Sequence, residues 1–208
     1  MKTLIRISGL VATLAFGASA QAGVNLVVDG DFSTPNTNGG WGAFSPAATG
    51  WTNSAENGGY VEIGASNNYG LPVVGKGQNL EVNYNTFGNV SQTINGLTLG
   101  QSYLLSYLYG GRPGGGFQSL TVSIGGSSQT DTGSIGVWTQ EYLSFTATSS
   151  SAVLTFASAV TNGNPSYGNE ITNVAVSAPE LSTWIMMLAG FGALAFAGYR
   201  RNKAGVAA

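Results

Sequence analysis

The sequence predicts an all-β domain of the sandwich or barrel type, placed between two short terminal segments. Many short β-rich runs follow one another, glycine and asparagine separate them, and no stretch between the termini keeps a helical period. In residues 119–124, for example, leucine, valine and isoleucine alternate with threonine and serine, as in a strand with one buried face. The predicted strands cover residues 25–28, 60–63, 79–84, 89–94, 102–109, 119–124, 138–145, 152–157 and 170–177.

Turn signals support these boundaries. Residues 95–96 are Asn-Gly, residues 125–126 are Gly-Gly and residues 162–163 are Asn-Gly, and each pair stands between two predicted strands. The glycine-rich segment 110–116 predicts the tip of a long hairpin. It does not indicate a phosphate-binding loop, because no helical pattern follows it.

The composition limits the chemistry. The chain has 208 residues, of which 43% are hydrophobic and 11% aromatic, so it can bury the core of one domain. It has no cysteine and no histidine. A Ser-His-Asp triad, a cysteine nucleophile and a zinc site with histidine or cysteine ligands are therefore excluded. We expect a protein that is not an enzyme and needs no catalytic cofactor.

Charge is distributed unevenly along the chain. Between the terminal segments the only basic residues are Lys76 and Arg112, whereas acidic residues occur throughout the domain. An acidic body without a basic patch argues against nucleic acid and against an anionic membrane surface as partners.

Residues 1–22 have the three parts of a secretory signal peptide in order. Lys2 and Arg6 supply the positive region, residues 7–16 form the apolar run, and small residues predominate near the end of the segment. The sequence therefore predicts export and cleavage by signal peptidase between Ala22 and Gly23. An N-terminal membrane anchor is the alternative, but the apolar run is too short to span a bilayer.

Residues 181–199 form an uncharged, mostly apolar run near the C-terminal end. As a helix this run would be about 28 Å long, close to the ~30 Å hydrocarbon thickness of a bilayer. Trp184 and Tyr199 mark its two ends, and a basic cluster follows in residues 200–203. The pattern predicts a transmembrane helix whose basic flank stays in the cytoplasm. The alternative is a buried core helix, but such a helix seldom lacks a polar face.

The segment 178–203, followed by a short tail at 204–208, resembles the PEP-CTERM sorting signal of Gram-negative bacteria. A Pro-Glu element, a Ser-Thr-Trp continuation, an apolar helix and arginines occur in the order of that family, with Leu181 where a second proline usually stands. The motif residues are Pro179, Glu180, Ser182, Thr183 and Trp184. The resemblance implies processing by exosortase, a precursor tethered in the inner membrane, and delivery to the cell surface or extracellular matrix. It also implies an association with exopolysaccharide and biofilm.

The domain between the termini, residues 23–177, resembles the galactose-binding-like jelly rolls of bacterial surface proteins. The resemblance is carried by an ordered series of segments: 25–32, 50–51, 60–63, 77–82, 91–93, 100–103 and 167–174. It implies a jelly-roll β-sandwich with the architecture of carbohydrate-binding modules. Some relatives hold a structural calcium near the first and last strands, which here implies Asp29, Asp31 and Glu170 as oxygen ligands.

Aromatic residues in loops are the candidate ligand contacts, because a sugar ring packs on a flat aromatic face and its hydroxyls need polar partners. Trp41 and Tyr69 lie in glycine- and asparagine-rich segments, so we expect both to be exposed. Tyr109 and Arg112 complete the predicted ligand-binding set, and extracellular polysaccharide is the predicted partner. The aromatic residues expected in the core instead are Trp51, Tyr103, Trp138 and Phe145.

Two other functions stay open at this point. One is a structural or adhesive matrix component without a defined ligand. The other is a paired-carboxylate glycoside hydrolase, for which Glu62 and Glu81, on neighbouring predicted strands, are the candidate acids. The competing interpretation of these two residues is that they are solvated acids on the outer faces of strands.

Overall fold

The computed structural model describes residues 23–116, 118–132, 134–159, 164–178, 190–194 and 196. Contacts divide the chain into a compact unit, Gly23–Pro179, and a second unit made of the two terminal segments. In the second unit the described residues 190–194 and 196 are helical, and their large apolar side chains are exposed. Within the described parts of the chain, no helix has the length and apolar character needed to cross a membrane.

Several predictions for the termini fall on residues outside these ranges. They concern the signal peptide 1–22, the sorting motif 179–184 and most of the transmembrane segment 181–199. They stay predictions.

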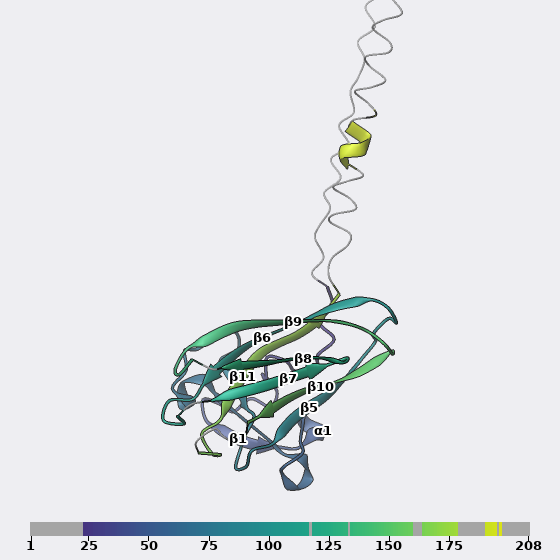
Figure 1. The fold of residues 1–208 in the computed structure, drawn as a ribbon. Helices are drawn as coiled ribbons and strands as arrows, with labels where there is room; N and C mark the ends of the chain where they lie inside the picture. Colours follow the sequence, from purple (N-terminus) through teal and green to yellow (C-terminus); the bar gives the residue numbers. More distant parts are fainter. Residues whose placement is uncertain are drawn as a thin grey trace, which may run out of the picture. The chain divides into compact units, whose positions relative to one another are not determined.

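Two antiparallel sheets form the compact unit, and Figure 1 shows them as two stacked layers. The six-stranded sheet has the order β1 (Trp41–Phe44), β3 (Val61–Ala65), β4 (Gln78–Glu81), β11 (Asn169–Ser177), β6 (Ser102–Gly111) and β9 (Trp138–Thr146). The five-stranded sheet has the order β2 (Thr52–Asn53), β5 (Asn89–Asn95), β10 (Ser151–Ser158), β7 (Ser119–Ile124) and β8 (Ser127–Thr132). Short helical turns are α1 (Pro46–Thr49), η1 (Asn57–Gly59) and η2 (Ser66–Tyr69). The prediction of an all-β sandwich is confirmed.

Every predicted strand except the first overlaps a strand of the structure. Residues 25–28 do not form one, because a side chain occupies the pairing position. The Oδ1 atom of Asn25 accepts a hydrogen bond from the Val176 N–H at 3.0 Å, and one backbone bond joins Leu26 to the Val176 carbonyl at 2.9 Å. The chain then turns at Asp29, whose φ of 47° is left-handed.

Strand β8 was not predicted, and neither were β1 and β2. The sequence of β8 is Ser-Ser-Gln-Thr-Asp-Thr, which has no apolar alternation, and the strand forms the edge of its sheet beside β7. The turn between β7 and β8 consists of Gly125 and Gly126 with φ of 56° and 84°. Both positions are left-handed, so glycine is what permits this two-residue hairpin.

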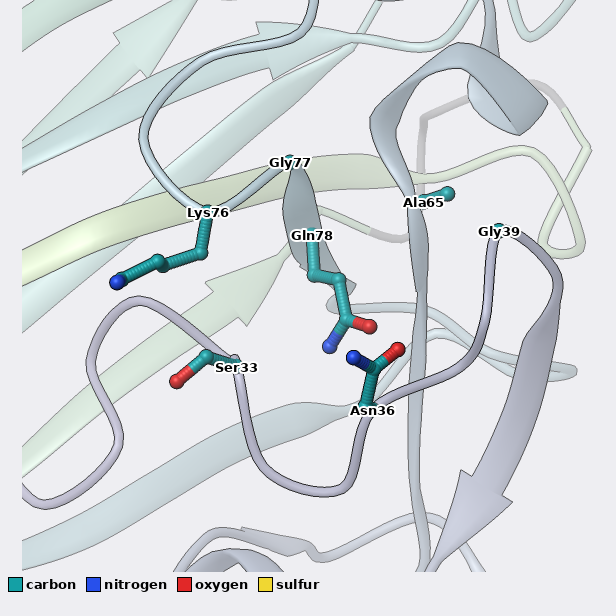
Figure 2. A pocket seen from close by; sticks show the side chains of 7 residues that line it. All are labelled: Ser33, Asn36, Gly39, Ala65, Lys76, Gly77 and Gln78. Carbon is teal, nitrogen blue, oxygen red and sulfur yellow. The ribbon is translucent and has the colours of Figure 1, made fainter.

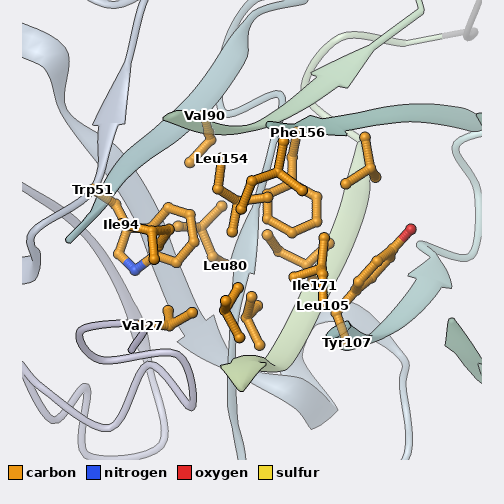
Figure 3. Packing of buried hydrophobic residues seen from close by; sticks show 14 of the residues in the cluster. Val27, Trp51, Leu80, Val90, Ile94, Leu105, Tyr107, Leu154, Phe156 and Ile171 are labelled. Carbon is orange, nitrogen blue, oxygen red and sulfur yellow. The ribbon is translucent and has the colours of Figure 1, made fainter. Parts of the chain in front are cut away.

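The core lies between the two sheets (Figure 3). Trp51, Tyr107 and Phe156 are fully buried, and the ring centroids of Trp51 and Phe156 lie 6.1 Å apart. The indole Nε1 of Trp51 donates to the Val28 carbonyl at 3.2 Å, so its one polar atom is satisfied.

The expected core aromatics are buried with one exception. Trp51, Tyr103 and Phe145 are buried, but Trp138 is only half-buried at the start of the edge strand β9. Its Nε1 donates to the Pro72 carbonyl at 2.8 Å, so the indole hydrogen-bonds to the loop that contains Pro72 rather than filling the core.

The glycine-rich segment after β6 is a crossing between the sheets and not a hairpin tip, because β6 and β7 belong to different sheets. Gln118 holds this crossing in place. Its Oε1 accepts from the Arg112 N–H at 3.0 Å, and its Nε2 donates to the Tyr167 carbonyl at 2.8 Å. The crossing thereby fixes the backbone from which the Arg112 side chain extends.

Candidate functional site

An open pocket of about 420 Å³ lies on the face of the six-stranded sheet that points away from the core. Glu62 in β3 alternates with the core residues Val61 and Ile63, so its side chain leaves the strand on that outer face. The other lining residues come from β1, from η2 and from loops that follow β4 and β6 or precede β11. The full set is Trp41, Glu62, Asn68, Tyr69, Tyr84, Asn85, Arg112 and Ser166.

Three glutamates lie side by side on this part of the sheet. Glu81 in β4 stands directly opposite Glu62 in β3 and directly opposite Glu170 in β11. Residues paired in this way point to the same face, with Cβ atoms roughly 4.5–5.5 Å apart. Glu62 is 8% exposed, and Glu81 and Glu170 are 0% exposed. The interpretation of Glu62 and Glu81 as solvated acids is therefore wrong, because other side chains cover this face of the sheet.

Arg112 is the cation of this cluster. Its Nη1 donates to the Glu81 carboxylate at 2.7 Å and to the Ser166 carbonyl at 3.2 Å. The guanidinium also lies over two aromatic rings, 4.8 Å from the centroid of Tyr69 and 4.4 Å from that of Tyr167. A guanidinium held by an ion pair and by cation–π contacts has little rotational freedom, so its position is fixed before any ligand binds.

Burial raises the pKa of all three carboxyls. For Glu62, the hydrogen bond from the Tyr69 hydroxyl and the charge of Arg112 oppose this effect. For Glu81, burial and the neighbouring Glu62 raise the pKa to about 7 against the lowering effect of Arg112. For Glu170, burial and the charge of Glu81 raise the pKa well above the ordinary range. The cluster therefore keeps protons at neutral pH that isolated glutamates have lost.

Glu170 and Asn79 form a matched pair within this cluster. The Asn79 Nδ2 donates to the Glu170 Oε2, and within the described residues Glu170 Oε1 and Asn79 Oδ1 have no partner. A proton on Glu170 supplies the missing donor, because Oε1–H can then donate to Oδ1 and close an acid–amide ring. The raised pKa and the two unpartnered oxygens both favour the protonated form of Glu170.

The ring of Tyr69 packs closely over β3. A Cβ added at Gly64 would lie 2.4 Å from the Tyr69 hydroxyl oxygen, so only glycine lets the ring approach the strand this far. The hydroxyl then donates to Glu62 Oε1 at 2.8 Å. Tyr69 is 3% exposed, which corrects the expectation of an exposed loop residue. Trp41, at the start of the edge strand β1, is 63% exposed.

The structure brings three of the four predicted ligand-binding residues together. Trp41, Tyr69 and Arg112 line the same pocket. Tyr109 does not, because it is fully buried on β6 and its hydroxyl donates to Asn169. A ligand on the surface cannot reach its ring.

Sequence reasoning missed several lining residues: Asn68, Tyr84, Asn85 and Ser166. Tyr84 has a φ of 55°, a left-handed conformation that costs an aromatic residue free energy and is found more often at functional sites. The Asn-Tyr-Asn run at 83–85 was the available signal, since an aromatic residue between asparagines ends the predicted strand there.

A second pocket of about 380 Å³ contains Asp29 and Asp31 together with Asn25 and Asn173. Burial, with a contribution from Asp31, raises the pKa of Asp29 to about 6, and Asp29 Oδ2 has no hydrogen-bond partner in the described structure. A buried carboxylate oxygen without a partner fits a calcium ligand.

Glu170, the third predicted calcium ligand, does not line this second pocket, because its side chain belongs to the glutamate row. Across the described residues, no three acidic side chains gather in a way that could hold a metal. The side-chain oxygens that this pocket offers to a cation therefore come from Asp29, Asp31 and Asn173, because Asn25 Oδ1 already accepts from the Val27 and Val176 N–H groups.

A third pocket of about 280 Å³ lies beside the loop before β1 (Figure 2). The side-chain amide of Gln78 ties this loop down, since Oε1 accepts from the Thr37 N–H at 2.7 Å and Nε2 donates to the Pro35 carbonyl at 3.1 Å. Its lining residues are Ser33, Asn36, Gly39, Ala65, Lys76, Gly77 and Gln78, and none is aromatic. This pocket lacks the flat surface on which a sugar ring packs.

No protein-family model matches the chain. Halomucin of Haloquadratum walsbyi is 32% identical over an alignment of 177 residues, and the match covers 80% of this chain and 2% of halomucin. Among solved structures, the chain is similar to TmCBM61, solved in complex with β-1,4-galactotriose, with a TM-score of 0.47 and 14% identity over 75% of this chain and 99% of that one. It is also similar to the xylan-binding CBM22-1 domain of Paenibacillus barcinonensis Xyn10C, with a TM-score of 0.45 and 16% identity over 77% and 97%.

Proposed function

We propose that the domain is a non-catalytic glycan-binding module and that the sugar binds in the pocket around Trp41 and Arg112. One observation carries the proposal: an exposed tryptophan, two tyrosines, two amide side chains and a guanidinium converge on a single open pocket. A sugar ring stacks its C–H face on an aromatic ring, while its hydroxyls exchange hydrogen bonds with amide and guanidinium groups. The pocket supplies both kinds of contact.

The site is also organised before a ligand arrives. The Tyr69 hydroxyl is held by Glu62, and Arg112 is held by Glu81 and by two rings. Little conformational entropy is then lost on binding, which favours affinity in a small site. Trp41 is the exposed member and offers the largest free ring face.

A glycoside hydrolase is the second candidate, because Glu62 and Glu81 are directly paired across β3 and β4. However, Glu81 does not line the pocket, and both of its carboxylate oxygens are engaged: Oε2 by Arg112 and Oε1 by the Gly168 N–H at 2.7 Å. A glycosidase needs two carboxyls that face the scissile bond. Only Glu62 meets that condition. Release of reducing ends from a glycan, lost in both Glu62→Gln and Glu81→Gln, would restore the hydrolase reading.

The proposed setting of this module is outside the cytoplasm. Export by the signal peptide, a temporary inner-membrane tether, exosortase processing near Pro179 and Glu180, and release into an exopolysaccharide matrix are inferred from the terminal segments. Mass spectrometry of the mature protein from fractionated cells tests these steps. An intact C-terminal end in every fraction would contradict processing and leave a plain membrane anchor.

The binding proposal is tested with the purified full-length protein on a glycan array and by isothermal titration against each glycan that is retained. Trp41→Ala should weaken binding by about tenfold or more, and Tyr142→Ala is the matched control because Tyr142 is 57% exposed on β9, outside the pocket. If no polysaccharide is retained by the unmodified protein, the domain is a structural or adhesive component instead.

A further inference from the structure

We propose that the pocket selects glycans by charge: it accepts sugars that are neutral or carry amino groups and excludes sugars that carry carboxylates. This inference rests on the proposed glycan-binding function and names the class of glycan for the same pocket. It follows from where the charged groups of the domain lie.

Among the lining residues that the structure describes, Arg112 is the only basic one, and its charge is already balanced. Its Nη1 is 2.7 Å from the Glu81 carboxylate, and Glu62 and Glu170 flank Glu81 in the row. As long as one of these three carboxyls is ionised, the cluster carries no net positive charge. Lys76, the other basic residue between the terminal segments, lines a different pocket.

Arg112 nevertheless keeps donors for sugar hydroxyls. Nη1 is shared by Glu81 and Ser166, and within the described residues Nε and Nη2 have no acceptor. These N–H groups can donate to a hydroxyl, which needs a hydrogen bond but no counter-charge. A carboxylate needs a counter-charge as well, because leaving water without one costs far more free energy than a hydroxyl loses.

Glu62 determines the sign of the charge on the pocket wall. Among the described lining residues it is the acidic one; burial raises its pKa, and the hydrogen bond that the Tyr69 hydroxyl donates to its Oε1 at 2.8 Å and the charge of Arg112 oppose this and favour the ionised form. The other titratable groups around it are Tyr84 in the lining and the covered Glu81 and Glu170, none of which adds positive charge. An ionised Glu62 repels a uronate carboxylate and attracts an ammonium group.

The experiment is a set of titrations of the full-length protein at pH 7.5 with oligosaccharides that differ in one substituent. One series is β-1,4-linked glucose, glucosamine and glucuronate, and the other is the galactose and galacturonate pair. Within a series, the uronate should bind about tenfold more weakly than the neutral sugar, and the amino sugar at least as tightly. Glu62→Gln and added salt of about 0.5 M should both reduce this difference in affinity between the uronate and the neutral sugar. Glu141→Gln, on β9 outside the pocket, should leave it unchanged.

The outcomes separate the two proposals. A uronate that binds as tightly as its neutral counterpart, or a difference in affinity that neither Glu62→Gln nor salt changes, overturns selection by charge. Loss of neutral-sugar binding in Trp41→Ala would then still support the glycan-binding function. Absence of binding to every member of both series and to every glycan on the array overturns the glycan-binding function, and selection by charge fails with it.

Discussion

The Nη1 atom of Arg112 lies 2.7 Å from Oε2 of Glu81, a carboxyl that is completely buried. This ion pair joins the loop that crosses between the sheets to the strand β4, and its Arg112 lines the pocket. It also sits in the middle of the glutamate row formed by Glu62, Glu81 and Glu170. One contact therefore links the stability of the sandwich to the geometry and charge of the candidate site.

Removing Arg112 should destabilise the protein more at alkaline than at acidic pH. In Arg112→Leu the buried Glu81 loses its counter-charge, and breaking such a pair costs about 3–5 kcal/mol when the remaining group stays ionised. At low pH Glu81 takes up a proton, so the loss is smaller. Urea unfolding at pH 5 and pH 8 measures both values. Adding Glu81→Gln should recover part of the loss at pH 8, and equal destabilisation at both pH values would contradict this account.

The glutamate row should make the protein less stable as the pH rises. The folded-state pKa values of Glu62, Glu81 and Glu170 are raised, so their contribution to stability is fully present below about pH 4.5, their ordinary value, and is lost as the pH rises through the folded values. For Glu81 this loss of stability extends up to a pH near its folded-state pKa of about 7. Thermal unfolding from pH 5 to pH 8 should show a falling midpoint, and a rising midpoint would contradict the shifts.

Two substitutions at Glu170 test its pairing with Asn79. Glu170→Gln keeps the hydrogen-bonded ring with Asn79, because an amide N–H can replace the carboxyl O–H as donor to Asn79 Oδ1. The glutamine side chain, unlike the carboxyl, cannot ionise. We expect it to stabilise the protein at pH 8 by about 1–3 kcal/mol and to change little at pH 5. Glu170→Leu leaves the Asn79 amide without partners and should destabilise at both pH values. If the Gln and Leu variants behave alike, the pairing is not formed.

Gly64→Ala should damage the pocket although Gly64 is not itself a lining residue. The new Cβ would fall 2.4 Å from the Tyr69 hydroxyl oxygen, so the ring must move and the hydrogen bond to Glu62 is lost. Overpacking of this kind costs about 1–3 kcal/mol. Unfolding measurements should show that loss, and glycan titrations should show weaker binding. Unchanged affinity would mean that the position of Tyr69 is not needed by the ligand.

Calcium should stabilise the protein through Asp29 and Asp31. Asp29 Oδ2 is buried without a hydrogen-bond partner in the described structure, and its pKa of about 6 means that calcium must compete with a proton below that pH. Adding millimolar calcium at pH 7.5 should raise the melting temperature, chelator should reverse the effect, and Asp29→Asn should abolish it. No shift with calcium at pH 7.5 would overturn the prediction.

The strand pattern could be predicted because alternation of apolar and polar residues marks strands with one face in the core. The polar edge strand β8 has no such alternation, and residues 25–28 have the composition of a strand but lose their pairing positions to the Asn25 side chain. The site was predictable in part, since aromatic residues and an arginine among glycines and asparagines indicated Trp41, Tyr69 and Arg112. Tyr109 was misjudged although it alternates in step with Tyr103, Leu105 and Tyr107 along β6, the pattern that places this face of the strand in the core.

The glutamate row could not be predicted from local sequence, because it depends on register between strands far apart in the chain. Glu81 and Glu170 are brought opposite each other by the pairing of β4 with β11. Sequence reasoning assigned Glu170 to calcium and left Glu62 as either a candidate catalytic acid or a solvated acid, and the register places both in one cluster with Arg112. The pairing of strands far apart in the chain therefore brings these acidic residues together, and local sequence does not report that pairing.

The most direct test of the glycan-binding function is the affinity of the full-length protein and of Trp41→Ala for the glycan that the array identifies. Trp41 is 63% exposed, so its loss should leave the unfolding midpoint nearly unchanged. Loss of one stacking ring should weaken binding by about tenfold or more, whereas Tyr142→Ala should bind like the unmodified protein. Equal affinity of the Trp41→Ala and unmodified proteins would show that the sugar does not bind in this pocket.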